Sequence, residues 1–189
     1  MKGITWRLLV LTVCVSLPVP ALAVEGHIPI SAPVTIGAPG RYVVTQNITA
    51  AAPIIIVNSN DVDIDLNGFT LTNTAAGTPV ISSNGFSQLT VHDGTIHGGL
   101  NSIYAFFGTT VVIENIKTEA AVGTSIYLSV VTNFVIRHSI VHFAGTRGID
   151  VDGTGLLGGV TGTIEGNLVD RCPNAIKLTA GHRDRKSVV

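Results

Sequence analysis

The stretch "VVIENIKTEAAVGTSIYLSVVTNFVIRHSIVHFAGTRGIDVD", Val111 to Asp152, contains the same two short patterns twice. "VVIEN" begins at Val111 and returns as "FVIRH" at Phe134, while "SIYLS" begins at Ser125 and returns as "GIDVD" at Gly148, so both patterns recur at one interval. Each segment alternates apolar and polar residues, which is typical of a half-buried β-strand. Two strand patterns that share one period indicate a repeat protein.

Both patterns extend through most of the chain. The first also occurs as "VDIDLNG" from Val62, "LTVHDG" from Leu89 and "GTIEGN" from Gly162, and its central apolar residues are Ile64, Val91, Ile113, Ile136 and Ile164. The second also occurs as "PVIS", "SIYAF" and "AIKLT", and its inward residues are Val80, Ile103, Ile126, Ile149 and Ile176. Turn-forming Asn, Gly, Asp and Thr clusters separate the segments, and no helical periodicity follows Ala23. We therefore expect parallel strands wound into coils, which stack about 4.8 Å apart and bury a continuous apolar column.

Composition agrees with a single all-β domain. The chain has 189 residues, of which 46% are hydrophobic, only 12% are charged and 21 are glycine. Its formal net charge of −1 does not indicate a basic surface for nucleic acid. The sequence also lacks a glycine-rich phosphate-binding loop, which would indicate a nucleotide site. We expect neither nucleic acid nor nucleotide as a partner.

The segment 1–23 has the features of a signal peptide. Lys2 and Arg7 precede an apolar run from Leu8 to Leu17, and the segment closes on the small-residue sequence Ala21-Leu22-Ala23. The run is too short for a transmembrane anchor. We expect cleavage before Val24 and a secreted, periplasmic or cell-surface location. Only Cys172 would then remain, so no internal disulfide is expected.

The C-terminal sequence "DRKSVV" at 184–189 differs from the pattern before it. It can be back-translated as GAT CGG AAG AGC GTC GTG, which resembles an adapter oligonucleotide used in sequencing. We expect a non-native tail here and hence a C-terminally truncated fragment; the alternative is an ordinary basic tail. The expected organisation is a signal peptide at 1–23, an N-terminal cap and entry strands at 24–53, and about five coils at 54–183.

The entry segment "APGRYVVTQNITA…IIIVNSNDVDIDLNGFTL" and the later "IEGNLVD…NAIKL" resemble secreted bacterial proteins of the right-handed parallel β-helix, or pectate-lyase-like, superfold. The resemblance covers residues 30–178. It implies the fold and not one activity, because the superfold includes lyases, hydrolases, epimerases, adhesins and non-catalytic modules.

The aspartates of "NDVDIDLNGFTL", Asn60 to Leu71, have two possible interpretations. Asp61, Asp63 and Asp65 could begin a calcium loop, or they could form the outer face of a strand. A helix-loop-helix calcium site needs glycine at its sixth position, where this chain has Leu66. The strand is the expected structure. Its outward column continues through neighbouring coils as Asp65, His92, Glu114, Arg137 and Glu165.

The second strand series predicts a strip of aromatic and charged residues on the other outer face. We expect an extended polysaccharide or cell-surface glycan to bind there, because rings stack on sugars while charged groups contact hydroxyls or uronate carboxylates. Packing alone also favours aromatic residues on strands. The substrate-binding candidates are Tyr104, Tyr127, Phe106 and Lys177.

Asp150, Asp152 and Arg147 in "RGIDVDGTG" are the catalytic candidates. Two carboxylates on one strand face lie roughly 6–7 Å apart, which approaches the spacing in inverting glycosidases. Calcium with an arginine base, as in pectate lyases, is the other possible use. However, the four polygalacturonase motifs are incomplete, since only "GHR" and "AIK" remain. The six histidines lack metal-binding spacing, so no metal or other cofactor is expected, apart from this possible Ca²⁺.

Two functions stay open at this point. The first is an exported β-helix module that binds glycan or serves as a surface scaffold. The second is a lyase or hydrolase of acidic polysaccharide, with part of its active site on missing coils.

Overall fold

A computed structural model describes residues 26–154 and 160–179 of the chain. The expected signal peptide at 1–23 and the expected tail at 184–189 lie outside these residues. The described residues form strands and turns without an α-helix, so they contain no helix that is long and apolar enough to cross a membrane. The all-β prediction is confirmed for this part of the chain.

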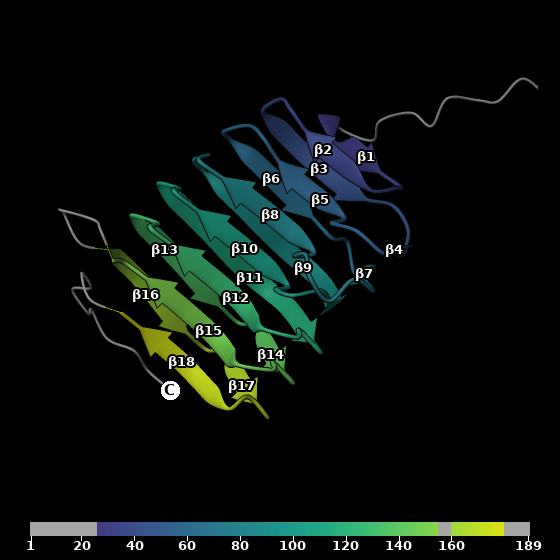
Figure 1. Ribbon diagram of the computed structural model, residues 1–189. Coiled ribbons are helices and arrows are strands. Elements are labelled where there is room, and N and C mark those ends of the chain that lie inside the picture. Colours follow the sequence, from purple (N-terminus) through teal and green to yellow (C-terminus); the bar gives the residue numbers. More distant parts are fainter. Residues whose placement is uncertain (1–25, 155–159, 180–189) are drawn as a thin grey trace, which may run out of the picture.

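Two parallel sheets run side by side along one axis, from β1 and β2 at one end to β16 and β18 at the other (Figure 1). The chain alternates between the sheets, so that each circuit adds at least one strand to each. The first sheet, sheet A, has the order β1 (Ile28–Ile30), β3 (Gly40–Val44), β6 (Val62–Asp65), β9 (Leu89–Gly98), β11 (Thr110–Glu119), β13 (Asn133–Arg137) and β16 (Thr161–Glu165). The second, sheet B, has the order β2 (Val34–Ile36), β5 (Ile55–Val57), β8 (Ile81–Asn84), β10 (Ile103–Phe106), β12 (Thr124–Ser129), β15 (Arg147–Asp152) and β18 (Asn174–Leu178).

Four short strands belong to sheet A beside its main path. They are β4 (Ile48–Ala50), β7 (Thr70–Asn73), β14 (Ile140–His142) and β17 (Leu168–Asp170). The strands of residues 28–50 are stacked on the later coils, since β3 pairs in parallel with β6 and β4 with β7. The first coils of the helix therefore begin within the segment expected to hold the cap and entry strands.

The interior consists of stacked aliphatic side chains, as the repeat predicts. Ile64 pairs in register with Val91, Val91 with Ile113, Ile113 with Ile136 and Ile136 with Ile164. The first four of these are 0% exposed. Burying one such side chain contributes about 1.5–3 kcal/mol, so the stacked columns supply most of the driving force for folding.

The second series stacks with one correction. Ile103, Ile126, Ile149 and Ile176 pair as predicted, but the residue before them in the column is Ile81 and not Val80. Val80 and Ile81 are both 0% exposed, so neither residue is outward and the apolar pattern alone could not choose between them.

This doubling recurs at the entry to five of the seven strands of sheet B. Two consecutive residues are buried at the entrance to successive coils, because the chain bends between them instead of alternating. The buried pairs are Ile54 and Ile55, Val80 and Ile81, Ser102 and Ile103, Ser125 and Ile126, and Gly148 and Ile149. We call this column the entry bend. At the last of these pairs, Arg147 before the pair contacts Asp150 after it.

A second bend lies within sheet A. Asp93, Asn115 and His138 have left-handed φ values of 59°, 53° and 52°, and Gly166 has 61°. The strands β9 and β11 continue across this bend, so His92 and His97 lie on the same strand. Asn115 and Asp93 are the residue types that tolerate such a conformation best.

Candidate functional sites on the two outer faces

The aspartates near Asn60 belong to the outer face of sheet A. Val62, Ile64 and Leu66 are at most 1% exposed, while Asp63 and Asp65 alternate with them and are half-buried. This alternation is that of a strand with one face in the core. The predicted strand is confirmed, and the helix-loop-helix calcium site is excluded at these residues.

The predicted strip runs along the outer face of sheet B. Tyr104 pairs in register with Tyr127, Tyr127 with Asp150 and Asp150 with Lys177. The ring centroids of Tyr104 and Tyr127 are 5.5 Å apart and their planes are inclined by 45°. Burial, together with the charge of Tyr127, raises the pKa of the Tyr104 hydroxyl, which therefore stays protonated at neutral pH. The structure thus brings these four residues into one row.

Phe106 extends this row sideways into an aromatic cluster. Its ring stacks against Tyr104 at 6.2 Å between centroids and meets Phe107 edge-on at 4.1 Å. Phe107 is 56% exposed although it follows a buried strand. Its left-handed φ of 55° ends the alternation. For this reason the alternating pattern did not predict Phe107 as an exposed ring of the strip. The only sign of it in the sequence was its position directly after Phe106.

The catalytic candidates Arg147 and Asp150 form an ion pair at this edge of the strip. Arg147 Nη1 donates a hydrogen bond to Asp150 Oδ2 at 2.9 Å. Asp150 is only 4% exposed, and its Oδ1 has no hydrogen-bond partner within the described part of the chain. Burial raises the pKa of Asp150 even though Arg147 and Lys177 act in the opposite direction. This carboxylate is therefore held in an environment that penalises its charge.

The carboxylate of Asp152 has different hydrogen-bond partners from that of Asp150. Its Oδ1 accepts hydrogen bonds from the backbone N–H of Thr154 at 2.9 Å and from the Thr154 hydroxyl at 2.5 Å. These bonds tie the carboxylate to the turn after β15. Two aspartates in the same strand thus have different surroundings, one buried against an arginine and one in a turn.

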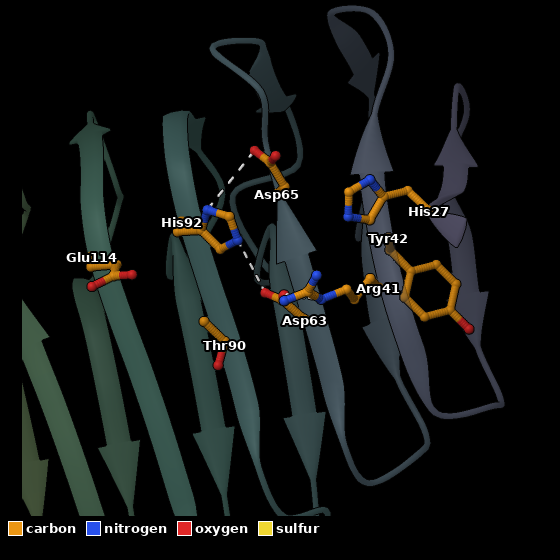
Figure 2. Close-up of a pocket in the computed structure, with 8 residues that line it drawn as sticks. All are labelled: His27, Arg41, Tyr42, Asp63, Asp65, Thr90, His92 and Glu114. Atoms are coloured by element: carbon orange, nitrogen blue, oxygen red, sulfur yellow. Dashed lines mark hydrogen bonds and ion pairs between the residues drawn. The ribbon is translucent and has the colours of Figure 1, made fainter. Parts of the chain in front are cut away.

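The outer face of sheet A carries a shallow pocket of about 380 Å³, drawn in Figure 2. Its side chains come from four neighbouring strands and from the residues before β1. They are His27, Arg41, Tyr42, Asp63, Asp65, Thr90, His92 and Glu114. In Figure 2 His92 lies between Asp63 and Asp65, with Arg41 on the far side of Asp63. The sequence pattern placed Asp65, His92 and Glu114 in one outward column, and these residues pair in register across neighbouring strands.

Carboxylates surround the imidazole of His92. Its Nε2 lies 3.0 Å from Asp63 Oδ1, and its Nδ1 lies 2.8 Å from Asp93 Oδ2 and 3.9 Å from Asp65 Oδ1. Burial opposes protonation, but the hydrogen bond to Asp93 and the charges of Asp63, Asp65 and Asp93 together raise the pKa of His92. The hydrogen bond from His92 in turn lowers the pKa of Asp93. The imidazole of His92 therefore lies among three carboxylates on this face.

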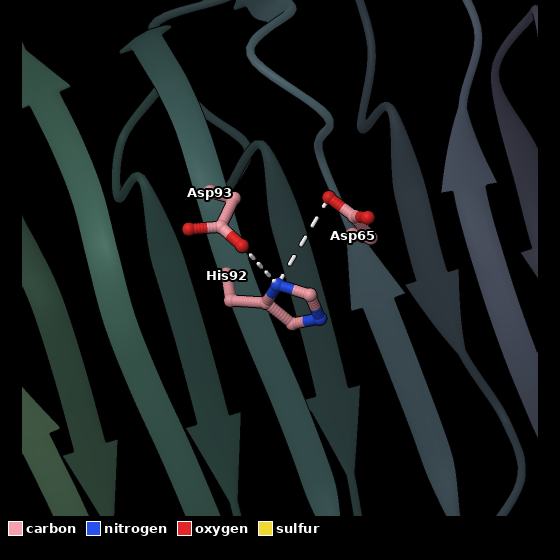
Figure 3. Close-up of side chains that lie close together, drawn as sticks. All are labelled: Asp65, His92 and Asp93. Carbon is pink, nitrogen blue, oxygen red and sulfur yellow. Dashed lines mark hydrogen bonds and ion pairs between the residues drawn. The ribbon is translucent and has the colours of Figure 1, made fainter.

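Asp65, His92 and Asp93 also bring their ligand atoms within 4.8 Å of one another (Figure 3). Among residues 26–154 and 160–179 this is the one group of three or more acidic, histidine or cysteine side chains with such convergence. The possible calcium site at Asp150 and Asp152 does not meet that condition within these residues. Linear spacing could not find this group, because Asp65 and His92 lie on successive coils and meet only when β6 pairs with β9.

Comparison with known proteins gives one match. The sequence model of the family described as "Right handed beta helix region" matches residues 44–186, which is more than half of the chain. No curated protein and no solved structure matches the chain.

Proposed function

Because the chain belongs to the right-handed β-helix family, we propose that it is an exported β-helix module that binds an acidic polysaccharide along the outer face of sheet B. The observation that carries this proposal is the row formed by Tyr104, Tyr127, Asp150 and Lys177 on four neighbouring strands. The sequence of residues 1–23 supports export. A cell-surface or secreted glycan would be the partner.

The aromatic half of the row suits the apolar faces of sugar rings. Tyr104, Tyr127 and Phe106 are half-buried, so their rings are held in place by their neighbours while part of each surface stays open. Rings that are already ordered lose little conformational freedom on binding, which favours affinity for an extended ligand. The protonated Tyr104 hydroxyl can donate a hydrogen bond to a sugar oxygen.

The charged half of the row favours an acidic chain. Lys177 is exposed at the end of the row, where a uronate carboxylate could pair with its ammonium group. Ser82, which pairs in register with Tyr104, extends the row with a hydroxyl on the opposite side of the two tyrosines. A glycan lying along the helix axis would thus contact hydroxyl, aromatic and cationic groups in turn.

A second function, a lyase or hydrolase of acidic polysaccharide, is supported by Asp150 and Arg147. A buried carboxylate with a raised pKa is suited to general acid catalysis, and the adjacent guanidinium could bind the carboxylate of a uronate. Asp152, whose Oδ1 is bonded to Thr154, would have to supply the second group. This arrangement is incomplete, so binding without catalysis is the better-supported function.

Affinity electrophoresis in gels that contain pectin, alginate or a neutral glucan tests the proposal. We expect retardation by an acidic polysaccharide and loss of that retardation in the double variant Tyr104→Ala/Tyr127→Ala. Phe143→Ala is the matched control, because Phe143 is an exposed ring, 47% accessible, that follows β14 of sheet A. Equal retardation of the double variant and the wild type would refute the binding face. Release of unsaturated uronides or reducing ends by the wild type, lost in Asp150→Asn, would favour the enzyme instead.

A further inference from the structure

We propose that Asp65, His92 and Asp93 form a binding site for one divalent transition-metal ion, with Zn²⁺ as the best-suited ion, and that Asp63 orients the imidazole. This site lies on the outer face of sheet A and does not depend on glycan binding by sheet B. The group in Figure 3 supplies one imidazole nitrogen and two carboxylate oxygens.

The distances suit a small ion after a modest adjustment of side chains. The ligand atoms of the three residues all lie within 4.8 Å of one another, and His92 Nδ1 is 2.8 Å from Asp93 Oδ2 and 3.9 Å from Asp65 Oδ1. Ligands in a tetrahedral zinc site at about 2.0–2.2 Å from the metal are separated by roughly 3.3–3.6 Å. A metal placed between these atoms would require movements of about 1 Å, within the reach of side-chain torsions alone.

A fourth residue holds the imidazole in the orientation that metal binding needs. Asp63 Oδ1 lies 3.0 Å from Nε2 of His92, on the side of the ring opposite Asp65 and Asp93. Histidine ligands commonly donate their second N–H to a carboxylate, which fixes the ring and leaves the other nitrogen for the metal. With the Nε2 proton directed at Asp63, Nδ1 is the nitrogen presented to Asp65 and Asp93.

The arginines around the pocket pair with other carboxylates. Arg41 Nε lies 3.5 Å from Asp63 Oδ2, and Arg137 pairs with Glu114 through both its Nε and Nη2. Among the described residues, His92 is the group that forms an ion pair with Asp65 and Asp93 when it is protonated. As a metal ligand, His92 would be neutral. A divalent ion would replace the proton of His92 and neutralise both carboxylates.

The backbone brings consecutive side chains to the same face. In a regular strand Asp93 would point away from His92, but its left-handed φ of 59° reverses this alternation. Asn115 Nδ2 donates to Asp93 Oδ1 at 3.1 Å, and the backbone N–H of Asn67 donates to Asp65 Oδ1 at 2.6 Å. Both carboxylates are therefore held by neighbours.

The choice of ion follows from the ligand types. An imidazole with two carboxylates suits Zn²⁺ and similar ions, whereas Ca²⁺ takes six to eight oxygen ligands and no nitrogen. The open pocket beside the group, about 380 Å³ in volume, leaves room for water to complete the coordination. We expect one ion per chain.

Isothermal titration of the untagged protein with ZnCl₂ tests the proposal, after treatment with a chelator and dialysis. The wild type is expected to bind one equivalent of Zn²⁺ with a rise in Tm. His92→Gln and Asp65→Asn are expected to abolish this saturable site. Asp63→Asn, which removes the orienting carboxylate, is expected to weaken binding about 10–100-fold. Circular dichroism of each metal-free variant checks that the β-structure is retained.

His142→Gln is the matched control, since Nδ1 of His142 lies 3.1 Å from a carboxylate oxygen of Asp170 on the same sheet. It should bind Zn²⁺ like the wild type. The proposal is overturned if the wild type has no saturable site, or if folded His92→Gln and Asp65→Asn bind as the wild type does. If Ca²⁺ bound to this site as tightly as Zn²⁺, the assignment of the His92 imidazole as a metal ligand would be overturned.

Discussion

Arg147 and Asp150 are three residues apart in one β-strand, yet their side chains meet on the same outer face, with Arg147 Nη1 2.9 Å from Asp150 Oδ2. A regular strand would direct residues i and i+3 to opposite faces. The entry bend makes the contact possible, because Gly148 and Ile149 are both buried and the alternation shifts by one residue. The ion pair on sheet B is thus a consequence of the backbone geometry between its two partners.

Gly148→Ala is expected to disturb this bend. A Cβ at Gly148 would lie 2.4 Å from Val169 Cγ1 and 2.6 Å from the backbone oxygen of Ala175, and the oxygen cannot move without shifting β18. Overpacking of this kind costs about 1–3 kcal/mol. Gly77→Ala is the control, because a Cβ there meets no atom of the described residues within 4 Å. Equal free energies of unfolding for the two variants in urea would contradict the role of Gly148.

Asp150→Asn is expected to change how stability depends on pH. The folded-state pKa of Asp150 is raised by burial, so the folded protein binds this proton more tightly than the unfolded chain, whose aspartate pKa is about 3.9. The stabilisation is complete below that value and is lost as the pH rises through the folded pKa. The wild type should therefore lose stability relative to Asp150→Asn between about pH 4 and neutrality. Thermal unfolding of both proteins across this range measures the difference, and a constant or reversed difference would rule the prediction out.

Ile126→Ala tests the contribution of the stacked column. Ile126 is 0% exposed and lies between Ile103 and Ile149 in register. Its truncation should cost about 2–5 kcal/mol, because it removes apolar contacts and leaves a cavity between coils. Val122→Ala should stay within about 0.5 kcal/mol, since Val122 is 53% exposed. Urea midpoints at a constant m-value give both numbers, and a loss below about 1 kcal/mol for Ile126→Ala would mean that neighbouring coils collapse into the space.

Lys177→Gln separates charge recognition from ring stacking on sheet B. The exposed ammonium group should attract an acidic glycan through an interaction that salt screens. We expect a loss of affinity for pectate or alginate of about five- to tenfold at low salt, which corresponds to roughly 1–1.4 kcal/mol. This loss should shrink as the salt concentration rises. An unchanged affinity at low salt would show that Lys177 does not contact the ligand.

Arg137→Gln tests whether the charged column of sheet A contributes to stability. Arg137 pairs with Glu114 on the neighbouring strand, and its side chain is 42% exposed. Exposed pairs of this kind contribute about 0–1 kcal/mol, so the free energy of unfolding of the variant, measured in urea, should lie within about 1 kcal/mol of the wild-type value. A larger cost would indicate that the pair organises the pocket beside it.

The period of the sequence was sufficient to predict the stacking of the coils. Ile113 and Ile136 lie one repeat apart and pair in register, as do Ile126 and Ile149. A parallel coil repeats its inward residues at the coil length, so apolar residues at that interval must share a column. The row of Tyr104, Tyr127, Asp150 and Lys177 followed from the same register.

The sequence alone determined the fold class, the coil period and, apart from Val80 in place of Ile81, the residues of each inward column. Strand alternation and repeat length can both be read from the order of apolar and polar residues. Only the tertiary structure decided where that alternation fails. The entry bend buries consecutive residues and pairs Arg147 with Asp150, while the left-handed Asp93 places its carboxylate beside His92. Asp65 reaches His92 only across a coil boundary. Contacts between residues far apart in the sequence, as well as those created by a local bend, require the assembled coils.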